Sequence, residues 1–227
     1  MTDGLLTSSG TYSEEVMTIM ADTAVGNERG WLAEYFEQFR TKLGQDGVLD
    51  QLVALKAMMM EAHVNGRKVI IAGNGGSAAI ASHCAVDFTK NAGIRCVNFN
   101  EADLITCLAN DYGYDRWLAK ALELYADDGD LVVLISSSGR SANIVRAAEH
   151  TVGRRLALVT LSGFAADNPL RALGGLNLWV DSRAYNIVEM THHIWLLAVC
   201  DLIIGAAEYP AVQEHGRARV AEPSVRV

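Results

Sequence analysis

The feature that most constrains the fold is a glycine-rich turn that directly follows an apolar run. Residues 69–72 read Val-Ile-Ile-Ala, residues 73–77 read Gly-Asn-Gly-Gly-Ser, and small helix-forming residues come next. Three glycines within four positions let the backbone turn tightly and approach a ligand closely. The helix that follows presents unpaired N–H groups at the positive end of its dipole. The stretch therefore predicts a strand, a loop that suits an anion, and a helix.

A second stretch repeats this design. The apolar residues 131–135 run into a serine-rich turn and then into helix-forming residues 142–149. Ser141 alone is explained by capping of that helix, but capping does not account for four serines. Hydroxyl groups at a helix N-terminus suit a phosphate dianion, so we predict phosphate binding here. The serines concerned are Ser136, Ser137, Ser138 and Ser141.

Strand and helix patterns alternate through the rest of the chain. This alternation predicts a parallel sheet with helices on both faces. Ligands of such sheets bind beyond the carboxyl ends of the strands, which is where both loops lie. Two helical segments, 12–24 and 28–62, precede the sheet, with a break expected at residues 44–47. The expected strands are 69–72, 95–99, 131–135, 156–161 and 177–180, and the expected helices are 77–90, 118–125, 142–150 and 187–204.

Composition excludes several classes of protein. The 227 residues suffice for one sizeable α/β core, and 50% of them are hydrophobic. The net charge of -8 argues against nonspecific binding of nucleic acid. The four cysteines show no CxxC spacing, which is typical of reduced thiols in a cytosol. We find no apolar run of membrane-spanning length and no targeting signal, so we expect a cytoplasmic protein that does not bind a membrane.

Two pairs of side chains with possible chemistry lie four residues apart on expected helices. His83 and Asp87 share a face of the helix after the glycine loop, and Glu189 and His193 share a face of the last helix. Such pairs suit an acid/base set or a metal site, although ordinary bonded helix pairs have the same spacing. Because His192 precedes His193, only one of these two rings can point inward.

A dinucleotide enzyme was considered as an alternative. Residues 73–78 satisfy the relaxed G-x-G-x-x-A fingerprint of such proteins. That fingerprint also expects an acidic residue at the end of the second strand, where this chain has Val97-Asn98-Phe99-Asn100 and reaches Glu101 late. The missing acid disfavours an oxidoreductase.

Three motifs taken together resemble the sugar isomerase (SIS) domain family, and within it the phosphoheptose isomerases. They are residues 73–77, residues 109–113, which read Ala-Asn-Asp-Tyr-Gly and are expected to form a turn, and residues 135–143. The resemblance spans residues 28–204. It implies a flavodoxin-like three-layer α/β sandwich, a homotetramer built partly through the N-terminal helices, and aldose-ketose isomerisation of sedoheptulose 7-phosphate. We accordingly divide the chain into an N-terminal segment (1–27), a SIS domain (28–208) and a tail (209–227).

The resemblance also implies roles for individual residues. The serine loop holds the phosphate, and the glycine loop lines the sugar site. The implied substrate-binding residues are Asn74, Gly75, Gly76, Ser77, Asn110, Asp111, Ser136, Ser137, Ser138 and Ser141. The family's last helix supplies a glutamine and a histidine at positions where this chain has Val188 and Leu196, neither of which can move a proton.

The expected chemistry needs a base, an acid and a group that stabilises an enediolate. Asp87 or Glu189 is the candidate base, and His83 or His193 the candidate acid. A zinc ion held by the same four residues is the candidate electrophile. Because the family's glutamine and histidine are replaced, a noncatalytic SIS protein that binds a phosphosugar or a protein partner as a regulator is the alternative.

Overall fold

The chain divides into two compact units, residues 1–46 and residues 47–227. The computed structural model describes residues 14–210 of the chain, and their side chains from residue 27 onward. The boundary between the units falls inside the segment that the sequence analysis assigned to the SIS domain. Most of the predicted tail, residues 211–227, lies outside the described residues.

The first unit contains one long helix, α1 (Glu14–Leu43). The sequence pattern indicated a helix ending near residue 24, but α1 continues without interruption to Leu43. Aromatic side chains at i, i+4 and i+8 form a row along it, because Trp31 stacks on Tyr35 and Tyr35 meets Phe39 edge to face. The predicted break at 44–47 is confirmed, since the next helix begins at Val48.

The second unit is built on a five-stranded, all-parallel sheet with the order β2-β1-β3-β4-β5. The predicted α/β fold with a central parallel sheet is confirmed. In this order the winding reverses between β1 and β3, so the carboxyl ends of these two strands flank the expected ligand crevice. The strands are β1 (Val69–Gly73), β2 (Cys96–Val97), β3 (Leu131–Ser136), β4 (Ala157–Ser162) and β5 (Leu176–Trp179). The helices are α2 (Val48–Val64), α3 (Gly76–Lys90), α4 (Ala102–Tyr112), α5 (Trp117–Tyr125), α6 (Ala142–Gly153) and α7 (Tyr185–Ile204).

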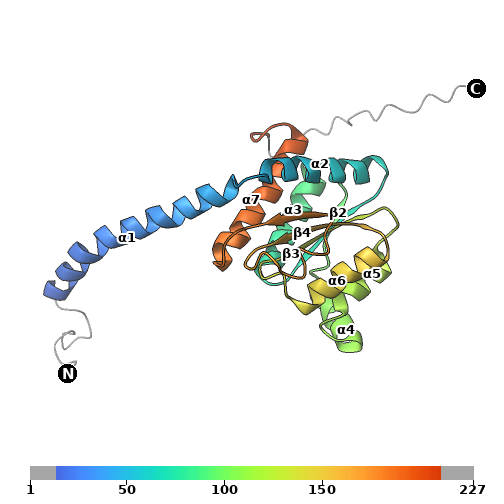
Figure 1. Cartoon of the computed structure of the whole chain (residues 1–227), viewed down its shortest axis with the longest axis horizontal. Coiled ribbons are helices and arrows are strands. Elements are labelled where there is room, and N and C mark those ends of the chain that lie inside the picture. Colours follow the sequence, from blue (N-terminus) through green and yellow to red (C-terminus); the bar gives the residue numbers. More distant parts are fainter. Residues whose placement is uncertain (1–13, 211–227) are drawn as a thin grey trace, which may run out of the picture. The chain divides into compact units, whose positions relative to one another are not determined.

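Helices cover both faces of this sheet (Figure 1). α2 and α3 pack against α7 on one face, and α4 and α6 pack against α5 on the other. Successive side chains of a strand point to opposite faces, so Ile70 and Val132 enter the core beneath α5 and α6. All five residues of β1 are buried, as befits a central strand covered on both sides.

One sequence expectation for this unit is wrong. The stretch around Asn110 and Asp111 was expected to form a polar turn, but both residues lie in the last turn of α4, which ends at Tyr112. The helix ends there because Gly113 follows with φ +89, a conformation that glycine adopts without strain. Residues 102–109 are apolar at helical spacing, which is the signal that predicts this helix.

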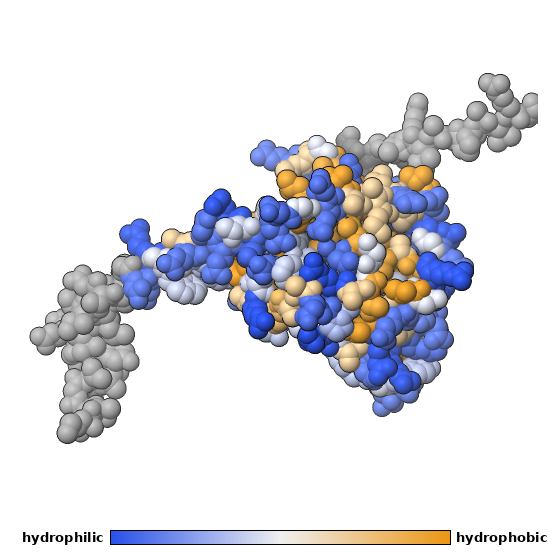
Figure 2. Space-filling view, viewed as in Figure 1, coloured by the Kyte–Doolittle hydropathy of each residue, from blue (hydrophilic) through white to orange (hydrophobic). Residues whose placement is uncertain are grey.

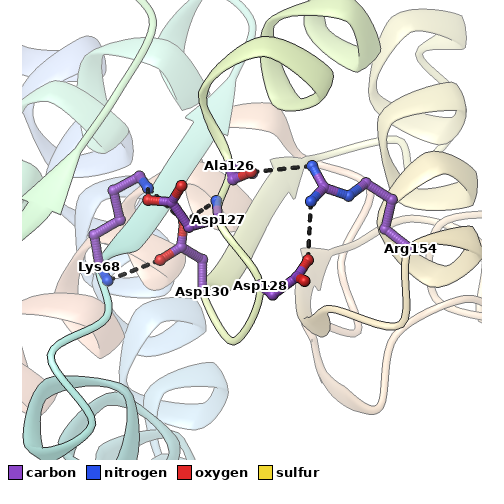
Figure 3. A network of polar contacts seen from close by, with 6 residues as sticks. All are labelled: Lys68, Ala126, Asp127, Asp128, Asp130 and Arg154. Carbon is purple, nitrogen blue, oxygen red and sulfur yellow. Dashed lines mark hydrogen bonds and ion pairs between the residues drawn. The ribbon is translucent and has the colours of Figure 1, made fainter.

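A network of charged side chains connects the segments at the amino ends of β1 and β3, at the edge of the sheet opposite the glycine and serine loops (Figure 3). Asp130 is fully buried and accepts hydrogen bonds from the backbone N–H groups of Lys68 and Asp127, at 2.9 and 2.7 Å. The ammonium group of Lys68 lies 2.6 Å from the carboxylate of Asp127 and 2.6 Å from that of Asp130. Arg154 reaches Asp128 from the end of α6. The network therefore joins the start of β1, the loop before β3 and α6.

α7 is the one helix of the described residues that is long and apolar enough to cross a membrane. Two of its bulky side chains, Trp195 and Leu196, are buried in the core. Packing on α2 and α3 therefore accounts for much of its apolar character. The visible face of this unit mixes apolar and polar side chains (Figure 2).

Candidate active site

A pocket of about 260 Å³ lies at the carboxyl ends of β1 and β3. The glycine loop and the start of α3 form one wall, the serine loop forms another, and the first turns of α7 complete it. Every residue predicted from these two loops lines the pocket. The lining residues are Asn74, Gly75, Gly76, Ser77, Ile135, Ser136, Ser137, Ser138, Ser141, Tyr185 and Glu189.

The glycine loop needs its glycines for two different physical reasons. Gly75, which precedes α3, has φ +54 and ψ -121, a conformation that side-chain-bearing residues rarely adopt. Gly76, the first residue of α3, lies directly beneath the carboxylate of Glu189, and a Cβ atom there would clash with that group. The loop therefore brings the N-terminus of α3 against a carboxylate from α7, where the helix dipole favours a negative charge.

The serine loop contains one hydroxyl group that has no hydrogen-bond partner in the described chain. Ser137 is only 5% exposed, and its Oγ has no hydrogen-bond partner within the described chain. Buried polar groups are nearly always paired, so an unpaired hydroxyl that lines a pocket indicates a ligand atom. Ser141 precedes α6 but makes no capping hydrogen bond, and its Oγ lies 3.3 Å from Oγ of Ser136 instead. Capping therefore does not explain this serine.

The two loops are joined by a pair of asparagines. Asn74 Nδ2 donates to Asn143 Oδ1 at 2.8 Å, and Asn143 Nδ2 donates back to Asn74 Oδ1 at 2.9 Å. Asn143 is buried in the first turn of α6. Because each amide satisfies the other, the pair fixes the distance between the glycine loop and the serine loop. Asn143 is a positioning residue that the sequence analysis quoted within a motif without giving it a role.

Four predicted side chains lie along the interface between α3 and α7. Glu189 meets Gly76 at the pocket, and one turn further along α7, Nε2 of His193 lies 2.9 Å from Nδ1 of His83. Nε2 of His83 in turn lies 3.2 Å from Oδ2 of Asp87. Glu189 is thus part of the pocket wall, whereas His83, Asp87 and His193 form a connected group beside it.

With both rings neutral, one proton arrangement satisfies these contacts. His83 carries its proton on Nε2 and donates to Asp87, which leaves Nδ1 to accept a hydrogen bond from Nε2–H of His193. Burial lowers the pKa of His193, and the neighbouring His83 lowers it further, while Asp87 opposes the shift. His193 is therefore neutral near pH 7, with a proton directed along a chain that ends on a carboxylate.

The predicted zinc set does not fit this arrangement. Both ring nitrogens of His83 are directed at protein partners, and Glu189 is directed at Gly76. Among residues 14–210, no three or more His, Cys, Asp and Glu side chains converge in a way that would hold a metal ion. Zinc at these residues stays a prediction.

The structure separates the two adjacent histidines of α7. His192 is fully buried and donates from Nε2 to the carbonyl of Ser162 at 3.0 Å, whereas His193 faces α3. Val188 and Leu196 also point into the core and are fully buried. Neither position can present a side chain to the pocket in this chain.

Asn110 and Asp111 do not line the pocket. Both are exposed on α4, where Asn110 Nδ2 donates to Asp111 Oδ1 at 3.0 Å. Their predicted substrate contacts are not made within a single chain and stay a prediction. In contrast, Tyr185 lines the pocket without having been predicted. Its position four residues before Glu189 on a helix is the signal that could have identified it.

Comparisons with known proteins identify the family of this chain. The model of the SIS domain matches residues 34–163. Phosphoheptose isomerase from Colwellia psychrerythraea (strain 34H) is 29% identical over 178 residues, which cover 74% of this chain and 91% of that protein. The structure of phosphoheptose isomerase from Neisseria gonorrhoeae matches with a TM-score of 0.72 and 26% identity, over 79% of this chain and 99% of the other. A phosphoheptose isomerase from Francisella tularensis, 21% identical over 80% of this chain and 98% of its own, shares the fold with the same TM-score of 0.72. The chain belongs to the SIS domain family.

Proposed function

We propose that this protein is an aldose-ketose isomerase of a phosphorylated sugar, with sedoheptulose 7-phosphate as its substrate and D-glycero-D-manno-heptose 7-phosphate as the product. The observation that carries the proposal is a pocket that the serine loop, the uncapped N-terminus of α3 and the carboxylate-bearing Glu189 line together. The family of the chain and the names of its relatives support the same activity.

The serine loop binds the phosphate in this proposal. Ser137 and its neighbours offer hydroxyl groups, and the first turn of α6 offers N–H groups that no side chain caps. The start of α3 faces the same pocket with its own uncapped N–H groups. Two helix N-termini and several hydroxyl groups suit a dianion without a basic side chain.

Glu189 is the proposed base, because it is the carboxylate among the residues that line the pocket. It takes the proton from the carbon next to the carbonyl, which leaves an enediolate, and returns the proton to the neighbouring carbon. His193 lies one turn along α7, and because its Nε2–H donates to His83, its Nδ1 is left to accept a proton from a sugar hydroxyl group. His83 and Asp87 hold that ring in place.

The layout suits a substrate with the phosphate and the carbonyl at opposite ends. The phosphate binds at the serine loop, and the sugar chain extends along the line where α3 and α7 meet, toward His193. A seven-carbon sugar 7-phosphate reaches further along this line than a shorter one. The relatives named phosphoheptose isomerase support this choice.

We also propose that the protein works as a homotetramer in the cytoplasm. Apolar side chains stay exposed on both units, including Phe36 on α1 and Ile194 on α7. Ile194 directly follows His193, so a second subunit covering this face would shield the histidines from water. Light scattering coupled to size-exclusion chromatography would test this, and a monomer at micromolar concentration would contradict it.

The activity is tested by incubating the protein with sedoheptulose 7-phosphate and following both sugars by NMR. We expect turnover in the wild type and a loss of about 10²- to 10⁴-fold in kcat for Glu189→Gln, since removal of a general base has this magnitude. Asp87→Asn should reduce kcat less, because Asp87 acts through His83. Glu149→Gln, an exposed carboxylate on α6, is the matched control and should keep full activity.

A noncatalytic phosphosugar-binding protein is the second candidate. It is favoured by the burial of Val188 and Leu196 at the positions where the family carries catalytic side chains. Tight binding of the sugar phosphate with no exchange of its C1 or C2 proton with deuterated solvent would establish this alternative and reject Glu189 as a base.

A further inference from the structure

Tyr185 is a large aromatic residue in a pocket whose other lining residues, apart from Ile135, are small or polar. It is the first residue of α7 and lies one turn before Glu189 on the same face. Its side chain is 60% exposed even though it lines the pocket. Most of the ring is therefore available to a ligand.

The ring is held by Phe164, which follows β4. The two ring centroids are 4.8 Å apart with an interplanar angle of 77°, an edge-to-face contact that aromatic rings favour. Phe164 adopts φ +56, in the left-handed region that residues other than glycine seldom occupy. A strained residue persists only where the surrounding structure fixes it, so this conformation is maintained by specific bonds.

Those bonds connect Phe164 to both sides of the pocket. Its own N–H donates to the carbonyl of Ser182 at 2.8 Å, in the segment that leads to α7. The preceding N–H, of Gly163, donates to the carbonyl of Ser137 at 2.9 Å. Phe164 thus joins the serine loop to the start of α7, and the Tyr185 ring is set at a fixed place relative to the proposed phosphate site.

We propose that Tyr185 is a specificity-determining residue that packs its ring against the carbon chain of the sugar, and that Phe164 is the residue that positions it. This inference rests on the proposed function. A sugar has C–H groups along its chain as well as hydroxyl groups, and an amphipathic ring such as that of tyrosine contacts both kinds of surface. The residue distinguishes a sugar phosphate from phosphate alone, because inorganic phosphate carries no carbon chain to contact it.

The test compares binding of sedoheptulose 7-phosphate and of inorganic phosphate by calorimetry. Tyr185→Ala should weaken binding of the sugar phosphate about tenfold and leave binding of phosphate within about twofold. Tyr185→Phe should bind both ligands as the wild type does, since the ring and not the hydroxyl makes the contact. Tyr114→Ala removes another exposed aromatic residue, away from the pocket, and should change neither affinity.

Phe164→Gly tests the positioning role, because glycine accepts the positive φ and removes only the ring. We expect about a threefold loss in affinity for the sugar phosphate, and no further loss when Phe164→Gly is added to Tyr185→Ala. Additive losses would show that Phe164 acts independently of Tyr185 and would overturn its positioning role.

The outcomes separate this inference from the proposed function. If the wild type turns over the sugar phosphate but Tyr185→Ala binds it unchanged, the role of Tyr185 is wrong and the isomerase stands. If Tyr185→Ala weakens both ligands equally, the ring supports the loop and not the sugar, which also rejects the inference. If the wild type binds phosphate but no sugar phosphate, both proposals fail.

Discussion

Substitution of Gly76 by alanine isolates the proposed role of Glu189 from the stability of the fold. The added Cβ would lie 2.7 Å from Cδ and 2.9 Å from Oε1 of Glu189, and closer still to Oε2. These are the far atoms of a flexible side chain, so the carboxylate can move aside. Gly76 is the first residue of α3 and has no positive φ, so the backbone accepts alanine without strain.

The expected magnitudes follow from these distances. Non-bonded carbon atoms in ordinary contact lie about 3.5 Å apart, so the carboxylate must move by roughly 1 Å. A displacement of about 1 Å in a reacting group costs on the order of 10² in rate. Alanine is a better helix former than glycine by up to about 1 kcal/mol, so the free energy of unfolding should stay the same or rise slightly.

The assay combines steady-state kinetics with urea denaturation of Gly76→Ala and two controls. Gly153→Ala adds a Cβ at the end of α6, where nothing lies within 4 Å, and should leave the activity unchanged and the stability the same or slightly higher. Gly73→Ala places its Cβ 2.8 Å from a backbone atom of Ser77, so it should lose stability as well as activity. Full activity in Gly76→Ala with the fold intact would show that the position of Glu189 does not matter, and would refute its assignment as the base.

Two further predictions concern stability. Asp130→Asn should cost about 2–4 kcal/mol in the free energy of unfolding, because it removes a buried charge that accepts bonds from two backbone N–H groups and from Lys68. Asp127→Asn, at an exposed carboxylate, should cost much less. Equal losses by urea denaturation would contradict this account of the network in Figure 3. Burial lowers the pKa of His192 from 6.5 to about 4, so the unfolded chain binds a proton between these values that the folded chain does not. Stability from this group is therefore present above pH 6.5 and is lost as the pH falls, by about 2 kcal/mol at pH 5, and His192→Gln should remove that part of the pH dependence.

The two loops were predictable from the sequence because their function depends on local chemistry. Glycines at fixed positions and hydroxyl groups before a helix are visible in the order of residues, and the strands before them are apolar runs. The contacts between α3 and α7 were not predictable in the same way. The spacing of Glu189 and His193 showed that they share a face, but nothing in it showed that Glu189 meets Gly76 while His193 meets His83. That division depends on how the two helices pack, which sequence periodicity does not define.

The structure also explains the two positions of α7, Val188 and Leu196, at which this chain lacks the glutamine and histidine that the resemblance leads one to expect. Val188 and Leu196 are eight residues apart and therefore share a face of α7, and in this chain that face is buried in the core. Tyr185, Glu189 and His193 follow one another at intervals of four residues and share the neighbouring face, about 100° around the helix from Val188 to Glu189. The three side chains of α7 that are proposed to bind the sugar or to react with it thus lie on one stripe. This stripe begins in the pocket and ends at His83. A site built on this stripe does not need Val188 or Leu196 to react. Loss of turnover in Glu189→Gln together with loss of sugar binding in Tyr185→Ala would show that binding and chemistry use the same face of α7.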